Sequence, residues 1–192
     1  MKENNWFDPF YIQSLLSEEE SNIQKNVRDF CNNELKPTVV ERNRKNEFDK
    51  ELYPKFGSLG VLGQTVKTHG GSGTSNLAYG LVAYEFEKID SSYRSSISVQ
   101  SSLVIHPINE FGSQEQKDKY LPSLIKGEKI GCFGLTESEA GSDPTSIKTS
   151  FKKTKDGYII NGSKNWITNA PIADIFIIWA IEENKDHKSI KG

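Results

Sequence analysis

Residues 134–143 read GLTESEAGSD and follow directly on an apolar run that begins at residue 129. The run is typical of a strand, and the glycine-containing stretch after it is typical of a loop. Such a loop presents backbone N–H groups and small hydroxyls to a polar ligand while excluding bulky side chains. The stretch is therefore a candidate binding loop, although the same residues taken alone also form ordinary turns.

The chain before this stretch is predicted to be helical, over residues 1–128. Ser17 precedes three glutamates, which is typical of a capped helix start, and apolar spacing carries that helix to about Leu35. Further helices are expected over residues 50–59, from Ser75 or Asn76 onward, over 93–111, and as a short pair over 114–121 and 122–126. The helix from Ser75 or Asn76 has the apolar set Leu77, Leu81 and Tyr84.

After residue 128 the pattern of the sequence changes from helical to extended. Strands are expected over residues 129–136, 151–153, 158–161, 164–168 and 175–181. Lys155-Asp156-Gly157 separates two of these strands and is typical of a hairpin turn, because glycine tolerates a positive φ. The fold class is therefore α+β, with a helical domain over residues 1–128 and a β segment over residues 129–192.

The last part of the sequence predicts an unfinished sheet. Residues 175–181 are almost continuously apolar, which favours a central strand covered on both faces. The polar tail after them is typical of a hairpin loop, and the chain then ends with no further strand predicted to cover the edge. We interpret this as truncation. The competing interpretation is a partner chain, or a naturally short variant, that covers the edge.

Composition excludes several classes of function. Lys and Arg number 24 against 26 Asp and Glu, and no basic block offers a footprint for nucleic acid. The longest apolar run, residues 175–181, is too short to cross a bilayer. The first ten residues lack the pattern of a signal or transit peptide. Cys31 and Cys132 have no metal-type partners and are expected to be buried, so the sequence predicts a soluble cytoplasmic protein without a metal site.

A second motif makes the interpretation of the first as a binding loop more specific. Residues 161–169 read NGSKNWITN. Trp166 alone would be interpreted as a core aromatic residue. Together and in this order, however, the two motifs resemble the acyl-CoA dehydrogenase family, and residues 111–137, FGSQEQKDKYLPSLIKGEKIGCFGLTE, resemble that family's approach to its first flavin strand. The likeness covers nearly the whole chain.

The resemblance implies a helical domain followed by an incomplete antiparallel β-barrel domain, with the family's carboxy-terminal helical domain absent. It implies FAD as the cofactor. Trp166 would pack on a face of the flavin, and the Thr168 hydroxyl would bond its edge near N5. The cofactor contacts implied are Phe133, Gly134, Leu135, Thr136, Glu137, Ser138, Glu139, Ala140, Gly141, Ser142, Trp166, Ile167 and Thr168. Ser142 is also expected to reach the pantetheine–phosphate arm of a CoA ester.

The substrate is suggested by residues 87–108, EKIDSSYRSSISVQSSLVIHPI, which are similar to the corresponding run in glutaryl-CoA dehydrogenases. By that resemblance Arg94 clamps the distal carboxylate, Ser95 and Ser98 donate hydrogen bonds, and Glu87 pairs with Arg94 when no substrate is bound. A pocket for a plain fatty chain would require apolar side chains instead. Two alternatives stay open: Arg94 as a solvated helix-start residue, and a short unsubstituted acyl substrate. The Ser138-Glu139-Ala140 triplet departs from the Pro-containing version common in this subfamily.

The implied reaction is the oxidative dehydrogenation of glutaryl-CoA between its α and β carbons, followed by decarboxylation to crotonyl-CoA. The complete enzyme would pass electrons to electron-transfer flavoprotein and form a homo-tetramer. The family's catalytic glutamate belongs to the absent carboxy-terminal domain, and no carboxylate here is assigned its role. We therefore expect this chain to be inactive alone and to bind flavin weakly or not at all. The alternative from a different class is a non-catalytic remnant or interaction module.

Overall fold

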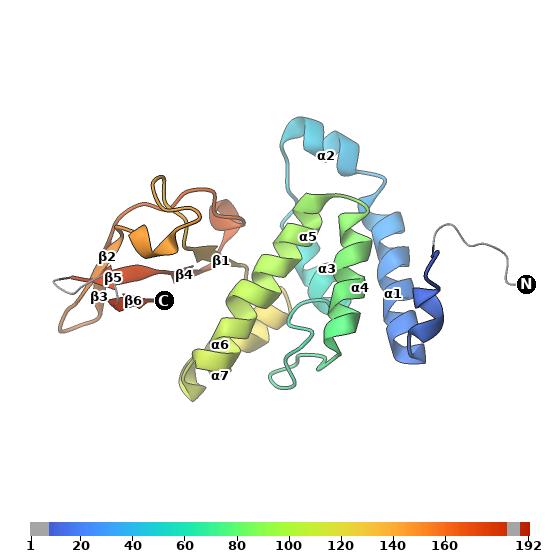
Figure 1. Cartoon of the computed structure of the whole chain (residues 1–192), viewed down its shortest axis with the longest axis horizontal. Helices are drawn as coiled ribbons and strands as arrows, with labels where there is room; N and C mark the ends of the chain where they lie inside the picture. Colours follow the sequence, from blue (N-terminus) through green and yellow to red (C-terminus); the bar gives the residue numbers. More distant parts are fainter. Residues whose placement is uncertain (1–7, 184–188) are drawn as a thin grey trace, which may run out of the picture.

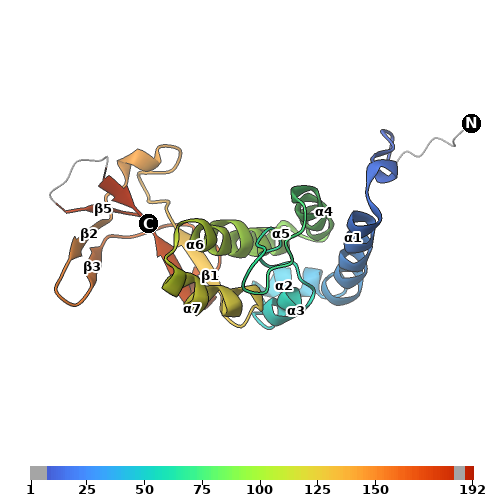
Figure 2. The same ribbon diagram turned by 90° about the horizontal axis from the view of Figure 1, so that it is seen from below.

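The computed structural model describes residues 8–183 and 189–192. Helices form one end of an elongated molecule and strands form the other. The strand β1 (Gly131–Gly134) lies between them, beside the rod made by α5 (Ser91–Ser98) and α6 (His106–Phe111) (Figure 1, Figure 2). The helical elements are η1 (Ile12–Leu15), α1 (Glu18–Phe30), η2 (Cys31–Leu35), α2 (Val39–Lys45), α3 (Leu52–Ser58), α4 (Asn76–Glu87), α5 (Ser91–Ser98), η3 (Val99–Ile105), α6 (His106–Phe111) and α7 (Gln114–Ile125). Among these described helices, none has both the length and the apolar character that crossing a membrane requires.

The first helix starts as its sequence predicts. The Ser17 hydroxyl accepts a hydrogen bond from the Glu20 amide, and the Glu20 carboxylate accepts one from the Ser17 amide at 3.0 Å, which completes a capping box. The π-type segment η2 extends α1 to Leu35, so the predicted length is confirmed. Gly60 follows α3 with φ 75, which is the left-handed conformation that ends many helices.

The helix predicted over residues 93–111 is confirmed, with two differences in detail. It begins two residues earlier, at Ser91, and its cap is the Asp90 carboxylate, which accepts from the Ser92 amide. Its middle section, η3, is a π-type segment. The predicted pair of short helices after Ser113 is wrong, because α7 runs through Pro122 without a break. The helix α2 was not predicted.

The buried face of α4 differs from the expected one. Leu77 and Tyr84 are 50% and 55% exposed, whereas the buried residues of this helix are Ala78, Val82, Glu85 and Phe86. The apolar spacing of Leu77, Leu81 and Tyr84 therefore marks the flank of the helix rather than its core face. The correction has a physical cause: α1 packs against α4 and brings Arg28 to within 2.9 Å of Glu85, so this buried carboxylate has a charged partner.

The core of the molecule lies within the helical end. Phe56 is the centre of an aromatic cluster, with edge-to-face contacts to Phe30, Tyr53 and Phe86 at centroid distances of 5.3 to 6.0 Å. Both cysteines are buried and free, as the sequence predicted.

The strands form two small sheets. They are β1 (Gly131–Gly134), β2 (Ser150–Lys153), β3 (Tyr158–Asn161), β4 (Ile175–Ile178), β5 (Ala180–Glu182) and β6 (Ile190–Lys191), accompanied by the 3-10 turns η4 (Pro144–Ser146) and η5 (Ala170–Ile172). One sheet pairs β1 with β4 in parallel, with Gly131 opposite Ile175. The other has the order β3-β2-β5-β6, with β2 and β5 parallel and its remaining pairs antiparallel.

The helical domain followed by an incomplete, open β domain is confirmed. The expected antiparallel pairing is corrected, because two of the strand pairs are parallel. The hairpin at residues 155–157 forms as predicted, with Gly157 at φ 153. Residues 164–168 are not a strand. Trp166 adopts φ 59, and this left-handed turn of the backbone prevents a continuous ladder.

The apolar run 175–181 serves two sheets rather than one central strand. The chain leaves β4 at Trp179, whose amide donates to the Gly134 carbonyl at 3.1 Å, and then enters the other sheet as β5. The expected cover on both faces is wrong for β4, because Phe176 is largely exposed. The expected open edge is wrong for β5, because β6 pairs with it. Among the described strands β4 pairs with β1 alone, so one edge of β4 stays open as predicted.

Candidate functional site

The two motif segments lie side by side. The Asn165 amide donates to the Thr136 carbonyl at 2.9 Å, and the Lys164 ammonium donates to the Leu135 carbonyl at 2.9 Å. These hydrogen bonds join residues 27 or more positions apart in the sequence, and they lie just after the end of β1. The structure therefore brings together the two segments whose combination suggested a binding site.

The carboxylate of Glu137 connects the first motif to the second motif and to residues 148–149. Its buried carboxylate accepts from the Lys164 ammonium at 2.7 Å, from the Lys148 amide at 2.6 Å and from the Thr149 amide at 3.0 Å. Burial raises the pKa of Glu137, but the hydrogen bonds from Lys164, Thr149 and Lys148 outweigh it and lower the pKa from 4.5 to about 2. The carboxylate is therefore charged at neutral pH and is engaged by protein donors.

Beyond Lys164 the chain exposes a bulky aromatic residue. Trp166 is 91% exposed although its backbone lies in the left-handed region at φ 59. A large side chain in this conformation is strained, and strain of this kind gathers at functional sites. Thr168 next to it is also exposed, while Ile167 is half-buried. The segment 166–168 thus presents an apolar ring and a hydroxyl outward.

The predicted contacts of the first motif separate into an inner and an outer group. The buried members are Gly134, Glu137 and Ala140; the half-buried ones are Phe133, Leu135 and Thr136; the exposed ones are Ser138, Glu139, Gly141 and Ser142. Phe133 packs edge-to-face on Trp179, and Glu139 pairs with Lys148 at the surface. A β-carbon at Gly134 would lie 2.7 Å from the Cδ1 of Ile178, so a larger residue here would require the end of that side chain to shift.

The predicted carboxylate clamp lies on α5. The Arg94 Nε donates to the Glu87 carboxylate at 2.6 Å, across the turn between α4 and α5. Hydrogen bonds from Arg94 and Ser91 lower the pKa of Glu87. Ser95 and Ser98 are half-buried on the same helix. Arg94 is thus accessible and already holds a carboxylate.

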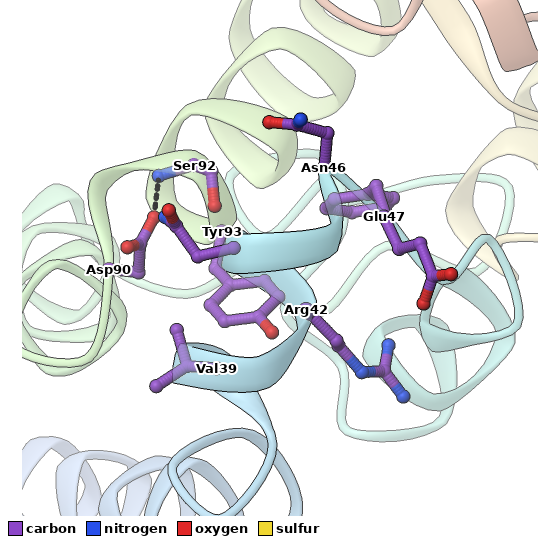
Figure 3. A pocket seen from close by; sticks show the side chains of 9 residues that line it. Val39, Arg42, Asn46, Glu47, Asp90, Ser92 and Tyr93 are labelled. Atoms are coloured by element: carbon purple, nitrogen blue, oxygen red, sulfur yellow. Dashed lines mark hydrogen bonds between the residues drawn. The ribbon is translucent and has the colours of Figure 1, made fainter.

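A separate pocket of about 290 Å³ lies between α2 and the start of α5 (Figure 3). Val39 and Tyr93 form its wall, and the Asp90 carboxylate is occupied in capping α5. Arg42 donates to Asp49 at 3.0 Å. None of the residues predicted for the site lines this pocket, so we assign it no part in the site.

Other carboxylates near the helical rod are also engaged. Glu85 is buried, accepts from Gln24 and Arg28 at 2.9 Å each, and lies 3.4 Å from Lys88. It is therefore a structural charge that links α1 to α4.

Sequence reasoning gave no role to three residues that hold these parts together. Lys164 braces Glu137, Gln100 accepts from the Gly131 amide at 2.8 Å, and Asn169 donates to the Gly131 carbonyl at 3.1 Å. A glutamine in the run ISVQSSLVI, residues 97–105, whose apolar side chains predict burial, was the available signal for Gln100, since buried polar side chains require partners.

A helical domain that continues into open mixed sheets, with two motif loops braced against each other after β1, defines a two-part α+β protein with a candidate ligand site at these loops. Two family descriptions match it: the acyl-CoA dehydrogenase N-terminal domain over residues 17–128 and the acyl-CoA dehydrogenase middle domain over residues 132–192. This chain belongs to the acyl-CoA dehydrogenase family.

The relatives differ in the substrates that their names give. The mitochondrial isovaleryl-CoA dehydrogenase of Pongo abelii is 40% identical over 86% of this chain and 40% of its own length. The short-chain specific acyl-CoA dehydrogenase of Clostridium acetobutylicum is 39% identical over 92% of this chain and 46% of its own. The glutaryl-CoA dehydrogenase of Mycobacterium smegmatis, solved in complex with FADH2, is 41% identical, with a TM-score of 0.88 over 91% of this chain and 45% of that chain. This chain spans less than half the length of each.

Proposed function

We propose that this chain carries the amino-terminal share of the flavin and acyl-CoA sites of an FAD-dependent acyl-CoA dehydrogenase. The observation that carries the proposal is the bracing of residues 164–168 on the loop after β1, which presents Trp166 and Thr168 outward from a strained backbone. The cofactor contacts proposed are those predicted from the sequence, with Glu137 acting through the shape of its loop because its carboxylate is engaged.

The donors in this segment fit a flavin. Trp166, Ile167 and Thr168 lie outside the helices and strands. Within residues 8–183 and 189–192, their backbone amides donate no hydrogen bond to another backbone group. The edge of a flavin carries carbonyl and nitrogen acceptors that require such donors when buried, and its face suits stacking on an exposed indole. When bound, FAD would supply the hydride acceptor of the reaction. Trp166, Thr168 and residues 133–142 would hold and orient it.

For the substrate we propose glutaryl-CoA, with dehydrogenation followed by decarboxylation to crotonyl-CoA. Arg94 supports this proposal because its guanidinium is accessible and binds a carboxylate, that of Glu87, at 2.6 Å. The distal carboxylate of the substrate would replace Glu87, with Ser95 and Ser98 as additional donors. Ser142, which is exposed, would contact the pantetheine–phosphate arm.

The second candidate is a short unsubstituted acyl-CoA. The likeness to isovaleryl-CoA and short-chain specific dehydrogenases favours it. On this alternative Arg94 stays paired with Glu87 and takes no part in substrate binding.

The proposal includes no catalytic base within this chain. Glu85 and Glu137 are held by cations in buried sites, and Glu87 is held by Arg94. We therefore propose that turnover requires chain beyond the part that aligns with these relatives, along with the tetramer and the electron-transfer flavoprotein that the family resemblance implies. A non-catalytic interaction module is the alternative.

Flavin binding tests the cofactor part directly. The purified chain is titrated with FAD while flavin absorbance and tryptophan fluorescence are recorded. We expect weak binding that quenches Trp166 and is reduced by Trp166→Ala, because the ring would lose its stacking partner. Trp179→Phe is the matched control, since Trp179 packs on Phe133 inside the fold. A complete absence of saturable binding would remove the proposal that this chain holds FAD by itself.

The substrate part is tested in a complete enzyme, made by joining this chain to the remainder of the Mycobacterium smegmatis glutaryl-CoA dehydrogenase. Arg94→Gln should reduce turnover of glutaryl-CoA about a hundredfold or more, because a carboxylate clamp of this kind contributes on the order of 3 kcal/mol. Turnover of butyryl-CoA should change little. Equal losses on the two substrates would exclude the carboxylate clamp and favour the unsubstituted substrate.

A further inference from the structure

The start of β1 is held by side chains from both sides. The Gly131 amide donates to the Gln100 side-chain carbonyl at 2.8 Å, and the Gly131 carbonyl accepts from the Asn169 side-chain amide at 3.1 Å. Gln100 lies fully buried on η3, and its amide group donates to the Leu124 and Lys129 carbonyls at 3.0 and 2.9 Å. A single backbone unit therefore connects the rod that carries Arg94 to the loop that carries Trp166.

Asn169 also fixes the shape of that loop. It adopts φ 70, and Trp166 adopts φ 59, so two left-handed residues enclose Ile167 and Thr168. Asparagine tolerates this conformation better than most side chains, whereas a tryptophan is held in it only by its surroundings. Lys164 anchors the loop at its start by bonding Glu137, and Asn169 anchors it at its end.

The same asparagine also influences a buried tyrosine of α3. The Tyr53 hydroxyl is buried without a partner of normal hydrogen-bonding geometry among the described residues. Burial raises the pKa of Tyr53, and the Ser96 and Asn169 side chains act in the opposite direction. Ser96 neighbours Ser95 on α5, the helix that carries the predicted clamp.

We propose that Gln100 and Asn169 are positioning residues that fix the 164–169 loop relative to the α5–η3 rod through Gly131. What they position, a flavin-facing loop against an acyl-binding helix, rests on the proposed function. The anchoring itself rests on the two hydrogen bonds to Gly131 and on the left-handed backbone of Trp166 and Asn169. Neither residue touches the reacting atoms in this proposal; each acts through the backbone that it holds.

The test uses Trp166 as its own reporter. In the full chain carrying Trp6→Phe and Trp179→Phe, Trp166 is the remaining tryptophan of three. Asn169→Asp keeps the size and the tolerance for a left-handed backbone, but an ionised carboxylate cannot donate to the Gly131 carbonyl. Trp166 anisotropy should fall at pH 7 and recover as the pH is lowered toward about 4, where a carboxyl in a buried site regains its proton and a donor.

The matched control is Asn46→Asp. Asn46 is also left-handed, at φ 54, but it ends α2 away from the loop. This variant should leave Trp166 anisotropy unchanged at every pH. Asn169→Gly, which permits the backbone angle but cannot donate, should lower the anisotropy without recovery in acid. Unchanged anisotropy in Asn169→Asp, or an equal fall in Asn46→Asp, overturns the proposal.

A FAD titration of the same variants separates this inference from the proposed function. If the wild-type chain binds FAD, Asn169→Asp should weaken the affinity about tenfold at pH 7, which corresponds to one lost buried donor. If the FAD affinity of Asn169→Asp is unchanged although its Trp166 anisotropy is lower, the proposal that Asn169 positions the loop for the flavin is overturned. If the wild-type chain binds no FAD, the cofactor proposal for this chain alone fails, and the anisotropy of Trp166 still decides whether Asn169 positions the loop.

Discussion

The helical end and the strand end of this molecule are held together in different ways. In the helical end, Tyr53, Phe56 and Phe86 are completely buried in one aromatic cluster. The strand end has few buried apolar side chains, and its β3 residues are exposed along the whole strand. Its order depends on polar braces, above all those made by Glu137.

This difference shows how one chain can combine a rigid support with a ligand-facing surface. Apolar burial stabilises without direction, whereas hydrogen bonds and ion pairs fix particular groups in particular places. The braces hold the two motif segments in register while leaving Trp166 uncovered. The comparison therefore predicts different consequences when each end is disturbed.

The largest effect is expected in the aromatic cluster. Phe56→Ala should lower the free energy of unfolding by about 3–5 kcal/mol, because it removes a fully buried ring and leaves a cavity. Urea unfolding followed by circular dichroism measures the change. Phe111→Ala is the matched control, since Phe111 is largely exposed and should cost less than about 0.5 kcal/mol. Similar losses in both variants would contradict the position of the core.

A smaller and more local effect is expected at the braces. Glu137→Gln should cost about 3 kcal/mol at pH 7, because it leaves the buried Lys164 ammonium without its counter-charge. Hydrogen exchange should accelerate in β2 and β3 while the amides of α4 and α7 keep their protection. Glu139→Gln is the control, since its pair with Lys148 lies at the surface.

The pH dependence of the same brace has a defined sign. The pKa of folded Glu137 is lowered from 4.5 to about 2, so its stabilisation is fully present above about pH 4.5. The stabilisation is lost as the pH falls from there toward about 2. Glu137→Gln should therefore remove part of the acid-induced loss of stability in the wild-type chain. An unchanged acid profile would show that Glu137 is not the group that titrates.

The sequence predicted what local chemistry determines. The Ser17 cap, the end of α3 at Gly60 and the hairpin at Gly157 depend on a few neighbouring residues, and each was found. The two motifs were also identified from short stretches, and the structure brings those stretches together. Whether those residues bind a flavin remains a proposal.

The errors arose where distant partners decide the structure. Residues 164–168 resemble a strand in composition, but Trp166 has a left-handed backbone. Both ends of its segment bond to distant residues, Lys164 to Glu137 and Asn169 to Gly131. Residues 175–181 resemble one buried strand, yet they divide between two sheets at Trp179. Periodicity alone does not indicate which sheet a strand joins.

The smallest effect is expected on α4, where the sequence and the structure disagree about the core face. Leu77→Ala should cost about 0.5 kcal/mol or less, because half of this side chain is already in solvent. Val82→Ala, five residues further along the same helix, should cost about 2 kcal/mol, because Val82 is completely buried. Both values come from urea unfolding of single variants.

The two substitutions on α4 also test the comparison between the two ends. If Leu77 contributed as much as Val82, the core of the helical end would extend around both flanks of α4, and its order would depend less on the aromatic cluster. A small loss at Leu77 beside a large one at Val82 would instead confine the core to the side of α4 that carries Phe86 and faces Phe56. Apolar spacing on a helix would then be a weaker guide to its buried face than the charged pair that Glu85 makes with Arg28.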